Sequence, residues 1–104
     1  MVRMRFHFVP ALGRFNEARK WADELNAACR AAGCVEGRMW ALSIGPTNES
    51  VMEYEYESIA AWDADQTKFG STAEIMKVFR SGIDISEPGD RSYTELWEEA
   101  PTLA

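Results

Sequence analysis

The first regular pattern in the chain is an alternation of apolar and polar side chains. It runs through Val2, Arg3, Met4, Arg5, Phe6, His7 and Phe8. A period of two is typical of a β-strand with one apolar face and one polar face. Pro10 and Gly13 interrupt the alternation, because proline lacks a backbone donor and glycine favours turns. The pattern predicts a first strand over residues 2–9.

From Phe15 onward the apolar residues recur at steps of three and four. The residues with this spacing are Phe15, Ala18, Ala22, Leu25, Cys29 and Ala32. The spacing places them on one stripe of a helix, and Trp21 and Ala28 widen that stripe. Gly33 can adopt the left-handed conformation that commonly ends a helix. We therefore expect a helix between Phe15 and Gly33.

Two further strand patterns flank a cluster of turn residues. Residues 35–44 are rich in strand-forming side chains and lead into Gly-Pro-Thr-Asn at positions 45–48. Alternation resumes over residues 51–57, where three glutamates alternate with Met52, Tyr54 and Tyr56. The two segments predict a β-hairpin.

Two short helices are expected after the hairpin. Ser58 can cap the first helix, which Gly70 ends. One face of this helix consists of Ile59, Trp62, Gln66 and Phe69. Ser71 and Glu74 have the spacing of a capping box ahead of the second helix, which Gly82 ends.

The last pattern is another alternation, over residues 91–97, which follows a polar turn at residues 86–90. It predicts a fourth strand and completes the order β-α-β-β-α-β in a single domain, residues 1–104. This order is the ferredoxin-like motif of the α+β class. The expected fold is a four-stranded antiparallel sheet with its helices on one face.

Helices on one face of a sheet leave the other face to meet water or another protein surface. The residues expected on that open face are Arg3, Arg5, His7, Glu53, Glu55, Glu57, Tyr93 and Glu95. The first strand lies between the third and fourth in this topology, so basic residues face acidic ones across strands. Trp97, and Trp40 in one hairpin register, add aromatic rings. A solvated face explains the charges, whereas the rings favour pairing with a second copy of the chain.

The composition and charge of the chain exclude some classes of binding partner. The chain has 104 residues, 46% of them hydrophobic, and a net charge of -6. No cluster of lysine and arginine could follow a phosphate backbone, so we expect no nucleic-acid partner. No apolar run approaches the roughly 20 residues that cross a bilayer, and residues 1–10 lack the pattern of a secretion signal. We expect a cytoplasmic protein with no membrane partner.

His7 is the only histidine, and an imidazole beside carboxylates can act as a general base. The alternative is a structural pairing with Glu53 or Glu55 across strands. The same three residues could in principle bind a metal, but a ladder of charges explains them equally well. Cys29 and Cys34 match neither a redox pair nor a zinc site, so we expect two reduced thiols, no metal and no cofactor.

The tyrosines of the third strand are the other candidate catalytic groups. Tyr54 and Tyr56 are expected on the helix side of the sheet, with Phe6, Trp21 and Trp62. An aromatic cleft with phenol hydroxyls could hold a planar, polyketide-like or quinone-like ligand. The alternative is that these rings form a plain hydrophobic core. Ser-His-Asp, P-loop and dinucleotide-binding patterns are absent from the sequence.

The segment IGPTNESVMEYEYESIAAW, residues 44–62, resembles the NIPSNAP family of the dimeric α/β-barrel superfamily, as do the Gly13 turn and its helix. The matching positions are Ile44, Gly45, Pro46, Asn48, Tyr56, Glu57 and Ser58. The resemblance implies a homodimer whose two sheets form a barrel, and a cavity between sheet and helices. The NIPSNAP family has no agreed activity.

Related barrels include cofactor-free antibiotic-biosynthesis monooxygenases and haem-degrading monooxygenases. The haem-degrading proteins carry a tryptophan and an asparagine about where this chain has Tyr56 and Phe6. Neither residue type is kept, which argues against haem degradation.

These observations predict a homodimer that binds a small aromatic ligand. The residues expected to bind it are Phe6, Trp21, Trp40, Trp62 and Glu55. The first alternative is a cofactor-independent monooxygenase or isomerase, with His7, Tyr54 and Tyr56 as catalytic residues. The second alternative is a protein-interaction module with a closed core.

Overall fold

The computed structural model describes residues 1–89 and 92–102 of the chain. Its elements are β1 (Val2–Phe8), α1 (Phe15–Ala32), β2 (Arg38–Ala41), β3 (Ser50–Tyr56), α2 (Ile59–Ser71), α3 (Ala73–Ser81), the 3-10 turn η1 (Gly82–Ile85) and β4 (Tyr93–Glu98). The strands form one antiparallel sheet in the order β2-β3-β1-β4. This is the predicted α+β, ferredoxin-like arrangement.

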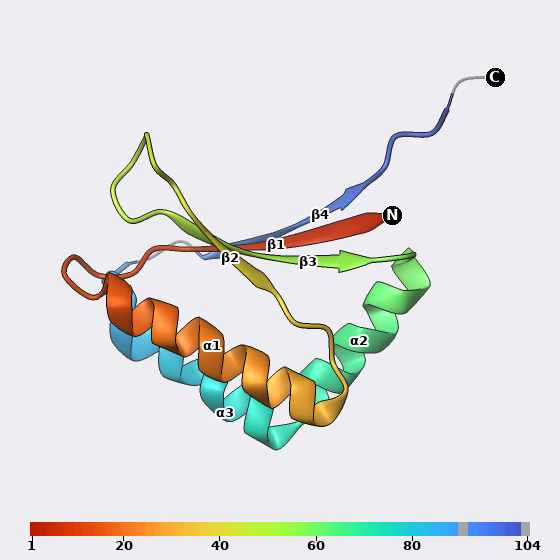
Figure 1. The fold of residues 1–104 in the computed structure, drawn as a ribbon, viewed down its shortest axis with the longest axis horizontal. Coiled ribbons are helices and arrows are strands. Elements are labelled where there is room, and N and C mark those ends of the chain that lie inside the picture. Colours follow the sequence, from red (N-terminus) through yellow and green to blue (C-terminus); the bar gives the residue numbers. More distant parts are fainter. Residues whose placement is uncertain (90–91, 103–104) are drawn as a thin grey trace.

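The molecule has two layers, the sheet and a layer of helices below one of its faces (Figure 1). Helices α1 and α3 lie side by side in that layer, and α2 leads from the end of β3 down to α3 (Figure 1). Helix α1 contributes most of the buried helical side chains, namely Ala18, Trp21, Ala22, Leu25 and Cys29. These residues occupy the stripe that the three- and four-residue spacing predicts.

Strand β1 separates apolar from polar side chains as its alternation predicts. Val2, Met4 and Phe8 are buried against the helices. On the other face, Arg3 lies opposite Glu55 and Arg5 opposite Glu53 in β3. The covered face of the sheet therefore forms the core, and the open face carries the charges.

Helix ends follow local chemistry, with one exception to the prediction. The Ser58 side chain accepts a hydrogen bond from the Ala61 amide at 3.1 Å, so the predicted cap of α2 is confirmed. The predicted capping box at Ser71 is wrong, because α2 continues through Ser71 and Thr72 occupies the N-cap position of α3. The hydroxyls of Ser71 and Thr72 both donate to the carbonyl of Lys68 instead.

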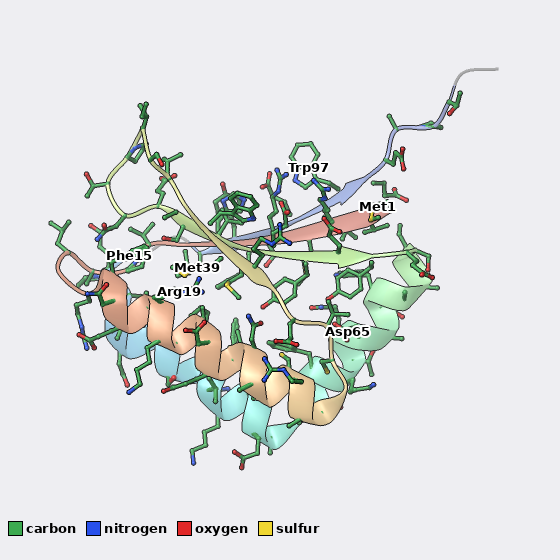
Figure 2. The ribbon with its side chains drawn as sticks, in the orientation of Figure 1. Met1, Phe15, Arg19, Met39, Asp65 and Trp97 are labelled. Atoms are coloured by element: carbon green, nitrogen blue, oxygen red, sulfur yellow. The ribbon has the colours of Figure 1, made fainter. Side chains whose placement is uncertain are left out.

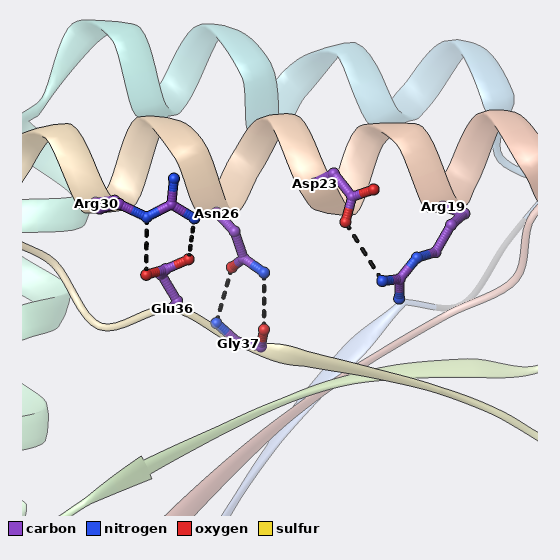
Figure 3. A network of polar contacts seen from close by, with 6 residues as sticks. All are labelled: Arg19, Asp23, Asn26, Arg30, Glu36 and Gly37. Atoms are coloured by element: carbon purple, nitrogen blue, oxygen red, sulfur yellow. Dashed lines mark hydrogen bonds and ion pairs between the residues drawn. The ribbon is translucent and has the colours of Figure 1, made fainter.

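The second strand is shorter than residues 35–44, since β2 spans only Arg38–Ala41. Just before it, the Asn26 side chain donates to the carbonyl of Gly37 and accepts from its amide, both at 2.8 Å (Figure 3). Arg30 pairs with Glu36 beside this contact (Figure 3). Helix α1 thus holds the chain that leads into the hairpin. In the fourth strand, the predicted start at Arg91 lies outside the described residues.

Candidate functional site

A pocket of about 320 Å³ opens on the helix-covered side of the sheet, between β1 and the end of α3 with η1. We call it the apolar pocket. Its walls include Phe6, Phe8, Ala18, Trp21, Phe79 and Ile85. Most of these side chains come from β1, α1 and α3, whose apolar sides face one another. The pocket therefore lies where the packing of core residues is incomplete.

Aromatic rings set the shape of the apolar pocket. Phe6 meets Phe79 edge to face, with ring centroids 5.3 Å apart, and Phe8 meets Trp21 at the same separation. The indole nitrogen of Trp21 donates to the carbonyl of Val78 at 2.9 Å. A side chain at Gly82 would place a Cβ 3.1 Å from the Trp21 ring, so this glycine permits the close approach. The Trp21 wall is therefore held in place from α3 and η1.

A smaller pocket of about 80 Å³, which we call the tyrosine pocket, continues from the apolar pocket toward β3. It shares the rings of Phe6, Trp21 and Phe79 with its larger neighbour and adds Tyr54 and Tyr56. The void expected between these tyrosines and the helices thus exists, but most of the open volume lies nearer to η1.

Both tyrosine hydroxyls are held in their neutral form. Tyr56 donates to the Asp65 carboxylate at 2.7 Å, and that carboxylate also accepts from the amide of Val35. Burial raises the pKa of Tyr56, and the hydrogen bond to the nearby negative charge of Asp65 raises it further. Burial likewise raises the pKa of Tyr54. At neutral pH each phenol can donate a hydrogen bond but cannot act as a base.

His7 lies on the opposite face of the sheet from both tyrosines. Its Nε2 pairs with the Glu95 carboxylate of β4, and its ring stacks on Tyr93 with centroids 4.2 Å apart. The predicted pairing with Glu53 or Glu55 is wrong, because the register places Val51 opposite His7 in β3. The two glutamates bind arginines instead, as Arg5 pairs with Glu53 at 2.9 Å and Arg3 with Glu55 at 3.1 Å.

The open face also carries exposed aromatic rings. Trp40 is 50% exposed, and Tyr93 and Trp97 are each 52% exposed. The register that pairs Trp40 with Val51 puts Trp40 on this face. Trp97 projects from the side of the sheet away from the helices, and the Arg5 guanidinium lies 5.7 Å from its ring centroid (Figure 2). A hollow of about 680 Å³ lies between the end of β1 and the hairpin arm, by which we mean β2, the start of β3 and the loop of residues 42–49 between them. His7 and Trp40 are among its lining residues.

The structure therefore divides the predicted ligand-binding residues among different places. Phe6 and Trp21 line the apolar pocket. Trp62 lies on the same side of the sheet, but its indole contacts the sulfur of Met4 at 3.2 Å. Trp40 and Glu55 lie on the open face and cannot contact a ligand in the apolar pocket.

Several residues that line the apolar pocket were not predicted from the sequence to bind a ligand. They are chiefly Phe8, Met76, Phe79, Arg80, Ile83 and Ile85. Met76, Phe79 and Arg80 follow the three- and four-residue spacing of one helix face, which is the available signal for them. Ile83 and Ile85 carry no such signal, because they lie in the single turn of η1.

The cysteines are free and buried. Burial raises the pKa of Cys29 to about 12 and also raises the pKa of Cys34. Both remain thiols at neutral pH and are therefore poor nucleophiles.

Among the residues that the structure describes, no group of three or more His, Cys, Asp or Glu side chains is arranged to hold a metal ion. No helix in the described parts of the chain is long and apolar enough to cross a membrane.

No protein-family model matches the chain, and no curated protein matches it. Several solved structures, however, have a similar fold. A NIPSNAP domain protein from Burkholderia xenovorans aligns with a TM-score of 0.76 at 14% identity, over 100% of this chain and 99% of that chain. A NIPSNAP family protein from Agrobacterium tumefaciens gives a TM-score of 0.72 at 14% identity, over 95% of this chain and 92% of that chain.

An antibiotic biosynthesis monooxygenase also aligns, with a TM-score of 0.70 at 14% identity, over 97% of this chain and 100% of that chain. The chain has the fold of these proteins. The resemblance to NIPSNAP and monooxygenase-type barrels is thus confirmed at the level of fold. At such low identity the likeness establishes the fold and leaves activity open.

Proposed function

We propose that the protein binds a small ligand with an aromatic ring in the apolar pocket. The observation that supports this most is the volume of about 320 Å³ bounded by four aromatic rings, Phe6, Phe8, Trp21 and Phe79. The pocket opens to the surface, so a ligand can enter it without unfolding the core. Its volume lies at the lower end of the range of about 300 to 1,000 Å³ that is usual for ligand pockets.

We also propose that a second copy of the chain covers the open face. Three half-exposed aromatic rings on one sheet face, Trp40, Tyr93 and Trp97, form the kind of apolar surface that marks an interface. Rows of basic and acidic side chains lie next to one another there, so the same surface can complement its own copy about a two-fold axis. The cytoplasmic location and the lack of nucleic-acid and membrane partners stay predictions from the sequence.

Binding is favoured over catalysis by the positions of the candidate catalytic groups. His7 lies across the sheet from the apolar pocket, so it cannot act on a ligand there together with Tyr54 or Tyr56. The raised pKa values of both tyrosines leave them without a basic form at neutral pH. A monooxygenase or isomerase reaction in this pocket would therefore need other groups, and the proposed role requires none.

The test is a calorimetric titration of the protein with 2-naphthoate and with its neutral analogue 2-naphthamide. The Ile83→Trp variant places a larger side chain at the mouth of the pocket, where Ile83 is 75% exposed. At least one ligand should bind the unmodified protein, and Ile83→Trp should weaken that binding at least fivefold. Ile44→Trp is the matched control, because Ile44 is 92% exposed on the hairpin arm and does not line the pocket.

The proposal fails if neither compound binds. It also fails if the Ile83→Trp variant binds the ligand as tightly as the unmodified protein and the Ile44→Trp control do. Both variants change isoleucine to tryptophan at exposed positions, so a difference between them reports on the pocket and not on the added ring.

A further inference from the structure

Arg80 is the one charged side chain among the described residues that line the apolar pocket. It lies in the last turn of α3, directly after Phe79, whose ring forms part of the pocket wall. No carboxylate is among the described lining residues. The lining is therefore mostly apolar and includes one residue that carries a positive charge, although the chain as a whole has a net charge of -6.

We propose that the ligand of the apolar pocket is an organic anion with an aromatic body, such as an aryl carboxylate, whose charged group binds Arg80. This inference rests on the proposed binding function and names the class of its ligand. The aromatic body would lie between the rings of Phe6, Phe8, Trp21 and Phe79, and the carboxylate would point toward α3.

Arg80 differs from most other arginines that the structure describes, because it has no acidic partner among the described residues. The arginines that form ion pairs are Arg3, Arg5, Arg14, Arg19 and Arg30. Within residues 1–89 and 92–102, no carboxylate lies within ion-pair distance of Arg80. A guanidinium that is not already paired is available to an external anion, and its planar fork matches a carboxylate with two parallel hydrogen bonds.

A purely structural role for Arg80 is a real alternative, because a cation in the last turn of a helix is favourable toward the helix dipole. That role depends on the position along the helix alone. It does not require the side chain to line a pocket, and it gives no preference between charged and neutral ligands. The two roles therefore predict different results for a pair of ligands that differ in charge.

Two other polar groups that line the pocket support the assignment, because each already donates its hydrogen within the protein. The Ser86 hydroxyl donates to the carbonyl of Gly82 at 2.7 Å, so its own hydrogen is already used. The indole hydrogen of Trp21 is likewise used, by Val78. Arg80 thus has free donors for an anion, whereas these two neighbours do not.

The experiment compares 2-naphthoate with 2-naphthamide, which have the same ring system and differ in charge, by calorimetric titration at low salt. The unmodified protein should bind the carboxylate about fivefold or more tightly, since hydrogen bonds to charged groups are the stronger kind and partial exposure reduces the effect. Arg80→Gln should bind the two compounds equally. Raising the salt concentration should reduce the preference in the unmodified protein.

Lys77→Gln is the matched control, because Lys77 lies on the same helix, carries the same charge and does not line the pocket. It should keep the preference for the carboxylate, and thermal unfolding of both variants checks that each is folded. Equal binding of the two compounds by the unmodified protein, or an unchanged preference in Arg80→Gln, would overturn the assignment while leaving the binding function in place. If neither compound binds, the binding function and this assignment fail together.

Discussion

The two faces of the sheet are built from the same alternating strands, yet they are held together by different interactions. On the covered face, Met4, Met52 and Tyr54 are buried in one hydrophobic cluster with side chains of α1. On the open face, neighbouring strands are linked by ion pairs such as Arg5 with Glu53 and by stacked rings such as His7 with Tyr93. Burial thus dominates the stability of one face, while the other is organised by pairs that water and salt weaken.

This difference explains why the candidate functions fall on separate faces. The apolar pocket is a gap in the packing of the covered face, so its ligand must be recognised mainly by shape and apolar contact. The open face has no helix above it and presents rings beside fixed charges, which suits a second protein surface. The four predictions below test the contrast, from the largest expected effect to the smallest.

Met52→Ala and Val51→Ala change adjacent residues of β3 that point to opposite faces. Met52 is fully buried, so its truncation should lower the free energy of unfolding by about 2 to 5 kcal/mol. Val51 lies on the open face opposite His7, and its truncation should cost under about 1 kcal/mol in the isolated protomer. Urea unfolding at low protein concentration measures both. Equal losses would show that the two faces are not different in kind.

Trp97→Ala tests the proposed partner of the open face. Removing this half-exposed ring from the proposed interface should weaken self-association at least tenfold, because large aromatic side chains dominate such contacts. Sedimentation velocity over a range of concentrations provides the measurement. The control is Ile59→Ala, which removes an exposed apolar side chain on α2 and should leave association unchanged. A protomer that stays single at every concentration would refute the proposed homodimer.

Alkaline unfolding tests the burial of the tyrosines on the covered face. The pKa values of Tyr54 and Tyr56 are raised in the folded chain from an ordinary value of 10.0, so above that pH the unfolded chain loses protons first. The stability that each tyrosine contributes is full below pH 10.0 and decreases as the pH rises toward its folded pKa, by about 1.4 kcal/mol per pH unit for each tyrosine. The buried thiols of Cys29 and Cys34, whose pKa values are raised from an ordinary value of 9.0, add to this loss above pH 9.0. Denaturant titrations at successive pH values should show this slope.

The slope above pH 10.0 should become shallower in Tyr56→Phe, since one of the buried groups that titrate in this range is gone. Tyr93→Phe, which removes a half-exposed hydroxyl on the open face, is the control and should retain the full slope. A Tyr56→Phe protein whose stability falls as steeply as that of the unmodified chain would contradict the assignment of the effect to this buried phenol.

The smallest effect is expected for the ion pair between Arg3 and Glu55. Their side chains are 46% and 52% exposed, so solvent screens the attraction. A double-mutant cycle with Arg3→Gln and Glu55→Gln should give a coupling of about 0.2 to 1 kcal/mol that shrinks as salt is added. A larger coupling that resists salt would indicate that this part of the open face is covered.

The sheet could be predicted from the sequence because the alternation that reveals each strand lies within that strand. Alternation at every second residue of β1 and β3 assigns each side chain to a face, and the order of elements restricts the topology. The pairing of individual residues was less accessible. His7 binds Glu95 because β4 pairs with β1 in a register that places Glu95 within its reach, and no pattern within either strand specifies that register.

The apolar pocket could not be predicted from periodicity for a related reason. Its outer wall depends on η1, a single turn that places Ile83 and Ile85 beside the end of β1 through a hydrogen bond from the Ala11 amide to the Ile85 carbonyl. One turn is too short to produce a repeat that a sequence pattern could reveal. The rings of Phe6 and Trp21 were recognisable as aromatic neighbours, but the space between them arises from packing of distant segments.

The double hydrogen bond between Asn26 and Gly37 has a consequence for the edge of the sheet. An outermost strand normally exposes backbone groups that another chain could extend, and such edges are a common origin of fibrils. Here the amide side chain of Asn26 from α1 binds both backbone groups of Gly37, directly before β2. The Tyr54 ring also leaves no room for a Cβ there, since one would lie 2.6 Å from it. The Asn26 side chain therefore satisfies the backbone donor and acceptor of Gly37, which are then not available to pair with another strand at this end of the edge.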